Sequence, residues 1–300
     1  MQKLSSYFLF LLISLSLTAT VQEKTYTIPF QLTDYNNLSI QAILNKKDTV
    51  NLMFHTAASA LTLTEDGLKR IKSLKFGRTD SVKSWGGSDN TSRYSESNTV
   101  QIGALKWEHV PIWENKNSGQ QTDGKFGLEL FENKTLEIDF DKKVIIVSTS
   151  LPAKAKTYEK LKLTYENEMM FVEATATIGN NTLKNKYLIH SGYAGAILFD
   201  DQFVAQHKIG DELTITAEKQ LKDSFGNVLK TKKAILPAFA IGKQELTNVS
   251  VGFFEGALGR QKMSIIGGDI LKRFNIIIDA KREFIYLKAN KLKNSAYANV

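Results

Sequence analysis

The chain has 300 residues, of which 42% are hydrophobic and none is cysteine, and its formal net charge is +8. This length and apolar content suit one large or two ordinary globular domains with a sizeable core. The absence of cysteine excludes disulfides, thiolate metal sites and cysteine nucleophiles. Basic residues are scattered among acidic ones and no basic stretch is interleaved with aromatic residues, so we expect no nucleic-acid partner.

Residues 1–20 have the features of an export signal. Lys3 supplies the positive start, an apolar run begins at Phe8, and small or hydroxylated residues follow up to Thr20. The apolar run is about ten residues long, which is shorter than a bilayer-spanning helix needs, so cleavage near residue 21 is favoured over an uncleaved anchor. We therefore expect an exported mature chain, periplasmic or extracellular, without a membrane span.

Short strands follow this leader. Residues 38–44 alternate between apolar and polar at a period of two, residues 45–48 form a turn, and residues 50–54 form a strand that runs into His55-Thr56-Ala57. The segment 84–98 is polar, contains glycine and lies between two strand-like runs.

The second half of the chain repeats the first. A strand over 171–178, a turn at 179–181 and a strand ending at Ile189 lead into His190-Ser191-Gly192. The run that begins at Gly127 matches the run that begins at Gly267, and helical spacing of apolar residues follows each glycine. Such a duplication predicts two lobes of one topology, each with a short helix.

These patterns predict a mostly β, two-lobed protein. The expected divisions are an N-terminal lobe at 21–150, a link at 151–160, a C-terminal lobe at 161–290 and a polar tail at 291–300. A duplicated chain supplies both lobes itself, so we expect a monomer.

The order of strand, small-residue loop, Ile-Gly strand, short helix and closing strand pair resembles one lobe of the pepsin-like and retropepsin-like aspartic peptidases. The resemblance covers residues 25–290, and the run from Ile266 to Leu271 is similar to the family's hydrophobic-hydrophobic-Gly signature. It implies a bilobal double-β-barrel fold with one cleft between the lobes. It also implies that His55 and His190 stand where the family has its two catalytic Asp residues.

The resemblance further implies roles for the neighbours of both histidines. Thr56 and Ser191 match residues that bond across to the opposite lobe, and Ser59 matches a hydroxyl that bonds the first catalytic position. Gly192 is kept, but Ala57 replaces a usual glycine, so we expect the first loop to be reshaped. The segment 84–98 matches the family's hairpin flap and is a candidate lid. Its candidate residues are Trp85, Gly86, Gly87 and Tyr94.

Two histidines cannot supply the chemistry of two aspartates. The carboxylate pair shares one proton, so that one member acts as a base and the other as an acid. An imidazole is never negative, and a close pair resists double protonation. We therefore expect no aspartic-peptidase activity, no cofactor, and a cleft that binds a peptide or protein ligand by pairing with its backbone.

Two alternatives stay open. One is a hydrolase that uses His55 or His190 as a general base, and the other is a metal site with both histidines as ligands and a third ligand not identified. Walker, GxSxG and HExxH motifs are absent. Ser191 beside His190 is not a triad, because a third, acidic member is missing.

Overall fold

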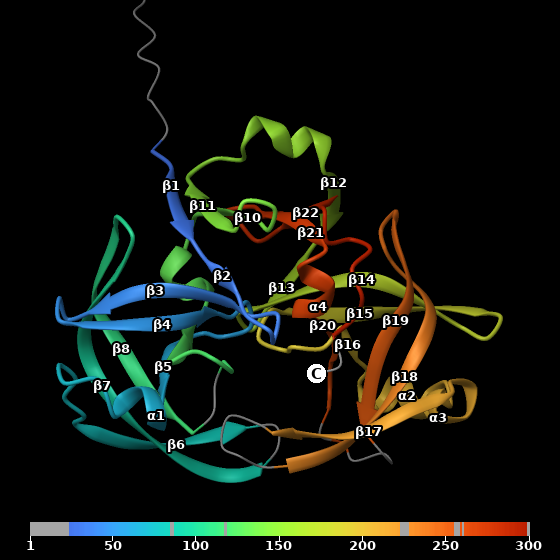
Figure 1. The fold of residues 1–300 in the computed structure, drawn as a ribbon, viewed down its shortest axis with the longest axis horizontal. Coiled ribbons are helices and arrows are strands. Elements are labelled where there is room, and N and C mark those ends of the chain that lie inside the picture. Colours follow the sequence, from blue (N-terminus) through green and yellow to red (C-terminus); the bar gives the residue numbers. More distant parts are fainter. Residues whose placement is uncertain are drawn as a thin grey trace, which may run out of the picture.

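Figure 1 shows the computed structural model, which describes residues 24–84, 87–116, 119–222, 228–254, 259 and 261–298. The described chain is mostly β and forms three sheets, two of eight strands and one of six. The expected mostly β, two-lobed fold is confirmed. The expected export signal at residues 1–20 lies outside the described residues. Within them, no helix has both the length and the apolar character that crossing a membrane requires.

The two eight-stranded sheets follow the same path, one in each lobe. Their orders are β2-β3-β4-β9-β5-β8-β7-β6 and β13-β14-β15-β20-β16-β19-β18-β17, and each has an extra pairing, β3–β7 and β14–β18. The first contains β2 (Gln31–Leu32), β3 (Leu38–Leu44), β4 (Asp48–Phe54), β5 (Leu61–Thr64), β6 (Arg78–Ser84), β7 (Gly87–Ile102), β8 (Leu105–Asn115) and β9 (Gly124–Phe126). The second contains β13 (Thr164–Glu166), β14 (Met169–Ile178), β15 (Asn181–His190), β16 (Ile197–Leu198), β17 (Ile215–Lys222), β18 (Val228–Ile241), β19 (Gln244–Phe254) and β20 (Ser264–Gly267). The repeat inferred from the sequence is therefore a repeat of topology.

The third sheet joins the lobes. Its order is β1-β11-β10-β21-β22-β12, and the central β10–β21 pair comes from opposite halves of the chain. It lies above both lobes in Figure 1. Its strands are β1 (Tyr26–Pro29), β10 (Thr135–Asp139), β11 (Val144–Ser148), β12 (Glu159–Lys162), β21 (Phe274–Ile278) and β22 (Phe284–Ala289). Each half thus gives three strands to a shared platform.

The expected link at 151–160 is ordered structure. It contains the 3-10 helix η2 (Ala153–Thr157) and the start of β12. Ala155 of η2 is buried in a small cluster with Ile277 and Tyr286 of the shared sheet. The link therefore packs onto the platform that it connects.

The other helices of the described residues are all short. They are α1 (Glu65–Leu68), η1 (Leu128–Phe131), α2 (Asp201–Gln206), α3 (Ile209–Glu212) and α4 (Gly268–Leu271). The helix expected after Gly267 is α4, whereas the one expected after Gly127 is the single 3-10 turn η1. Arg282 of the C-terminal half donates to the carbonyls of Phe131 and Lys134, at 2.8 and 2.9 Å, so these carbonyls are satisfied without a further helical turn.

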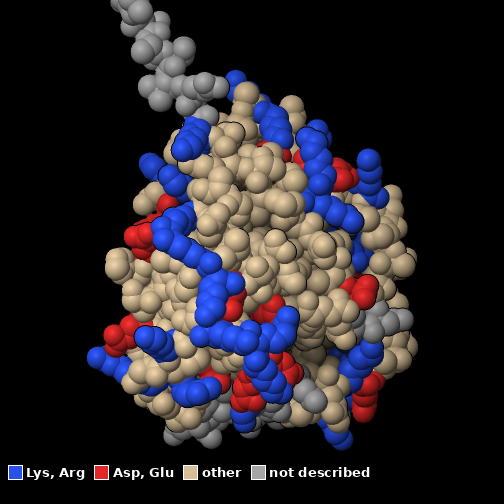
Figure 2. Space-filling view, turned by 60° about the vertical axis from the view of Figure 1, so that its left-hand side comes forward, with Lys and Arg blue, Asp and Glu red and all other residues tan. Residues whose placement is uncertain are grey.

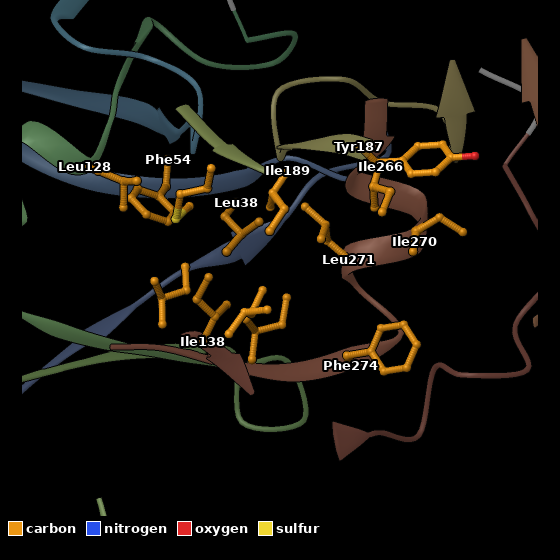
Figure 3. Close-up of a cluster of buried hydrophobic side chains, with 14 of the residues drawn as sticks. Leu38, Phe54, Leu128, Ile138, Tyr187, Ile189, Ile266, Ile270, Leu271 and Phe274 are labelled. Atoms are coloured by element: carbon orange, nitrogen blue, oxygen red, sulfur yellow. The ribbon is translucent and has the colours of Figure 1, made fainter. Parts of the chain in front are cut away.

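One hydrophobic core runs through both lobes and the platform. Figure 3 shows Leu38 and Ile138 from the first half beside Ile189 and Leu271 from the second. Since side chains from both halves fill the same interior, the lobes hold each other in place.

The expected polar tail is docked. Arg273 is buried against Asp269, and its guanidinium donates to the carbonyls of Lys293 and Ser295 at 2.9 and 2.7 Å. The ring of Tyr297 lies 3.8 Å from the guanidinium carbon. A buried guanidinium needs many acceptors, and the backbone of the tail supplies them.

The surface carries both signs of charge. Figure 2 shows Lys and Arg spread over the visible face with Asp and Glu among them. Exposed pairs such as Lys69–Asp66, at 2.6 Å, bring the two signs together.

Candidate functional site

His55 and His190 face each other where the lobes meet. His190 ends β15, and His55 directly follows β4, the equivalent strand of the other lobe. Their ring centroids are 4.5 Å apart with the planes at 60°. His55 is buried and His190 is half-buried. The duplicated topology therefore brings the two tripeptides together.

The residues after the histidines hold the lobes together by a reciprocal set of hydrogen bonds. Thr56 Oγ1 donates to the Ile189 carbonyl at 2.7 Å and accepts from the Ser191 N–H at 3.0 Å. Ser191 Oγ donates to the Phe54 carbonyl at 2.8 Å and accepts from the Thr56 N–H at 3.0 Å. Both side chains are almost fully buried. Each hydroxyl therefore satisfies two backbone groups of the loop on the opposite lobe.

A packed apolar floor supports this network. The space beneath Thr56 and Ser191 is a void of about 10 Å³, lined mostly by aliphatic side chains of both lobes and the platform. Such a void is too small and too apolar for a stable water. The hydroxyls are thus held from below by rigid packing.

Two glycines allow the loops to sit directly on neighbouring strands. A Cβ on Gly127 would overlap the carbonyl oxygen of Ala58, and a Cβ on Gly267 would overlap that of Gly195. The same strands anchor both loops, because the His55 N–H donates to the Phe126 carbonyl and the Gly267 N–H to the Ala196 carbonyl, each at 2.8 Å. The hydrophobic-hydrophobic-Gly runs therefore lie under the histidine loops.

Gly192 makes room for a histidine ring. A Cβ at this position would overlap the His55 imidazole. The equivalent Ala57 is accommodated without strain, since it is not among the described residues with positive φ. Both loops keep the same turn, with Ala58 N–H to the His55 carbonyl at 3.0 Å and Tyr193 N–H to the His190 carbonyl at 3.1 Å. The reshaping expected at Ala57 is not observed, because the loop backbone there does not need glycine.

Ser59 does not support His55, contrary to expectation. Its side chain is exposed, and no hydrogen bond joins these two described residues. The first loop instead bonds its own histidine through the backbone: the Ala57 N–H donates to His55 Nδ1 at 3.1 Å. Ser59 lies four residues beyond His55, past the turn that closes at Ala58, which carries it toward solvent.

Asn36 is a supporting residue that the sequence did not reveal. It lies in the β2–β3 loop with φ of 58°, and its amide donates to the Ala194 carbonyl of the second histidine loop at 2.7 Å. Lys272 donates to Asn36 Oδ1 at 2.9 Å. Asn is common in left-handed turns, and its place in the polar stretch 33–37 is the only feature of the sequence that points to such a turn here.

The flap candidates lie in an antiparallel hairpin of β6 and β7. Trp85 and Gly86 lie outside the described residues, and Gly87 begins β7. Tyr94 stacks on Trp113 of β8, with centroids 4.6 Å apart and planes at 18°. The hairpin that the resemblance implies is present, and the Tyr94–Trp113 stack fixes its base to β8.

The environment keeps both imidazoles neutral. Burial holds the pKa of His55 well below its ordinary value, and the charges of His190 and Lys125 lower it further. Burial, with a contribution from Lys125, lowers the pKa of His190 to about 4. Since His55 Nδ1 accepts the Ala57 N–H, the proton of neutral His55 is assigned to Nε2.

Lys125 is the second residue that sequence reasoning missed. It is half-buried in the middle of β9, and burial lowers the pKa of its ammonium to about 8. In the equivalent strand β20 the corresponding residue is Ile265, 140 positions later. The sequence did indicate this residue, because Lys125 occupies the position at which the repeat has an isoleucine.

The imidazoles are weak bases, and no cluster of metal-ligating side chains is grouped with them among the described residues. A base with a pKa of about 4 has little tendency to take a proton from water at neutral pH. Among the described residues no group of three or more His, Asp and Glu could hold a metal. A separate hollow of about 330 Å³ is lined by Asp66, Arg70 and Asp123 among others and includes neither histidine.

Comparison with known proteins supports the fold. No family model and no curated protein matches the chain. Among solved structures it is similar to an aspartic proteinase from Irpex lacteus, with a TM-score of 0.62 and 14% identity over 91% of this chain and 99% of that one. This likeness establishes an aspartic-proteinase-like fold across nearly the whole chain, and at this identity it establishes the fold alone.

The Thr56→Val variant tests the cross-lobe network. Valine keeps the shape of threonine but removes the donor to the Ile189 carbonyl and the acceptor of the Ser191 N–H, which leaves two buried backbone groups unpaired. We expect the free energy of unfolding, measured by urea denaturation, to fall by about 2–4 kcal/mol. Thr56→Ser keeps the hydroxyl and should lose only about 1 kcal/mol. Equal losses in both variants would contradict this role for the hydroxyl.

The neutral histidine pair predicts a pH dependence of stability. Because the folded-state pKa values are lowered, the unfolded chain binds more protons than the folded chain between about pH 6.5 and pH 4. The free energy of unfolding should therefore decrease as the pH falls through this window, by up to about 3 kcal/mol for His190. A His55→Asn/His190→Asn variant should show a flatter profile in urea titrations.

His109→Asn is the matched control for this experiment. His109 is exposed and has a φ of 58°, which asparagine tolerates, so the substitution should leave the pH profile unchanged. A double variant with the same pH dependence as the wild-type chain would show that the pair is not held neutral by the fold.

Proposed function

We propose that this chain is an exported binding protein that keeps the aspartic-peptidase framework without its proteolytic chemistry. Its ligand is an extended peptide or protein segment held between the lobes at the histidine pair. The observation that carries the proposal is the pairing of two neutral imidazoles with a neighbouring lysine, where the family's chemistry needs two carboxylates. The resemblance of residues 1–20 to an export signal supports the proposed location.

The intact hydrogen bonds and packing around the histidine pair support a binding role for this site. The cross-lobe hydrogen bonds of Thr56 and Ser191 are complete, and the floor beneath them is packed. A ligand between the lobes would therefore meet a rigid, pre-organised surface, which lowers the entropic cost of association.

A hydrolase with a histidine general base is the second candidate. The observation in its favour is His190 Nδ1, a buried atom without a hydrogen-bond partner among the described residues. Its low pKa argues against it, because proton transfer from water to so weak a base is unfavourable at neutral pH.

A cleavage assay separates the two candidates. The purified protein, incubated with unfolded casein and with a random peptide library from about pH 3 to pH 9, should release no new peptides, because neither imidazole is an effective base. Mass spectrometry provides the readout. Cleavage by the wild-type chain that disappears in the His55→Ala variant would overturn the binding-protein proposal.

Restoring the carboxylates should not restore a good peptidase. In a His55→Asp/His190→Asp variant the cation of Lys125 would favour ionisation of both carboxylates, whereas the reaction needs one proton shared between them. We expect negligible pepstatin-sensitive turnover in a fluorogenic peptide assay. Adding Lys125→Ile, which copies Ile265 of the other lobe, should raise that turnover. High turnover in the double variant alone would contradict an inhibitory role for Lys125.

A further inference from the structure

The lobes differ sharply in one row of residues beside the histidine pair. In the N-terminal sheet, Lys125 lies between Met53 of β4 and Thr62 of β5 in register. In the C-terminal sheet, Ile265 lies between Leu188 and Leu198 at the same topological places. The C-terminal members belong to an apolar cluster against which Ala57 and Tyr193 of the two histidine loops pack. The N-terminal row therefore carries a cation and a hydroxyl where the C-terminal row is apolar.

Lys125 has no anionic partner within the described part of the chain. No hydrogen bond or ion pair is formed by its ammonium there, and burial alone lowers its pKa to about 8. The group is still mostly protonated at pH 7, so it remains a cation in a half-buried position. Partial burial of an unpaired charge is unfavourable, so a negatively charged partner would stabilise this position.

Two buried polar atoms beside Lys125 and the pair also lack partners among the described residues. They are Thr62 Oγ1 and His190 Nδ1. Thr62 is 8% exposed and lies directly opposite Lys125 in the antiparallel β5–β9 pair, so their side chains are on the same face of the sheet. Buried polar atoms are almost always paired in proteins, so these two atoms, beside an ammonium that also has no partner among the described residues, point to a polar ligand.

We propose that Lys125, Thr62 and the His55–His190 pair bind one carboxylate group of a peptide ligand. This inference rests on the proposed function and specifies its ligand. An ammonium, a hydroxyl and the Nε2–H of His55 are all hydrogen-bond donors, and a carboxylate offers only acceptors. One cation balances one negative charge, whereas a phosphate monoester carries nearly two at pH 7. The apolar cluster of the C-terminal lobe favours a hydrophobic side chain next to the carboxylate.

Calorimetric titration with matched peptides tests the proposal and identifies the source of the carboxylate. Two pairs of short acetylated peptides of Ala, Leu and Phe serve as probes. One pair differs by a free or amidated C-terminus, and the other, amidated, differs by an internal Glu or Gln. We expect the charged member of at least one pair to bind the wild-type protein about tenfold or more tightly than its neutral counterpart.

The Lys125→Met variant should abolish this preference while still folding. Removal of an unpaired, half-buried charge should leave the thermal midpoint unchanged or raise it, so loss of binding cannot be attributed to unfolding. Lys106→Met, at an exposed position of β8, is the control and should keep the preference. Equal binding of charged and neutral peptides, or a preference that survives Lys125→Met, would overturn the carboxylate site and leave the proposed function standing. Failure of all four peptides to bind would overturn both.

Discussion

The reciprocal hydrogen bonds of Thr56 and Ser191 determine the geometry of the whole site. Each hydroxyl reaches into the opposite lobe and satisfies one N–H and one carbonyl there. Because all four bonds use backbone groups, they fix the two loops relative to each other irrespective of the side chain that precedes Thr56 or Ser191. Any residue at 55 and 190 is thus held facing its counterpart, provided that the loop can accommodate its size. This explains how the framework tolerates two imidazoles.

The chemistry of the site depends on differences between the lobes and not on their symmetry. The duplicated topology makes His55 and His190 equivalent, yet Gly192 faces a ring where Ala57 packs against the apolar cluster. Lys125 stands where the other lobe has an isoleucine, and its charge adds to the lowering of both histidine pKa values that burial causes. In an aspartic peptidase the centre is anionic, whereas here it is two neutral rings beside a cation. The sign of the charge at this centre is therefore opposite to that of a carboxylate pair.

The fold could be predicted from the sequence because each half of the chain carries the same pattern. Period-two strands and turns occur in both halves, and the run at Gly127 returns at Gly267. An element that is ambiguous in one half can therefore be identified from its equivalent in the other. The site was only partly predictable. The tripeptides and their cross-lobe partners follow from the repeat, but Asn36 acts through a left-handed turn and one side-chain amide. The prediction for Ser59 was wrong because the conformation of the turn after His55 decides whether this hydroxyl faces the histidine or solvent, and the sequence does not fix that conformation.

Buried polar groups that stabilise the fold have hydrogen-bond partners, whereas several beside the histidine pair have none within the part of the chain that the structure describes. Arg273, the most buried cation of the described chain, is saturated by Asp269 and by tail carbonyls, and the hydroxyls of Thr56 and Ser191 are saturated by the opposite loops. A lysine ammonium, a threonine hydroxyl and an imidazole nitrogen beside the histidine pair have no such partners among the described residues, and Asn37 Oδ1 and Tyr187 OH are in the same state elsewhere. The position of the first three beside the histidine pair means that one bound anion could satisfy them together. The residues that stabilise the lobes and those that await a ligand are therefore different sets, and the second can change without loss of the first.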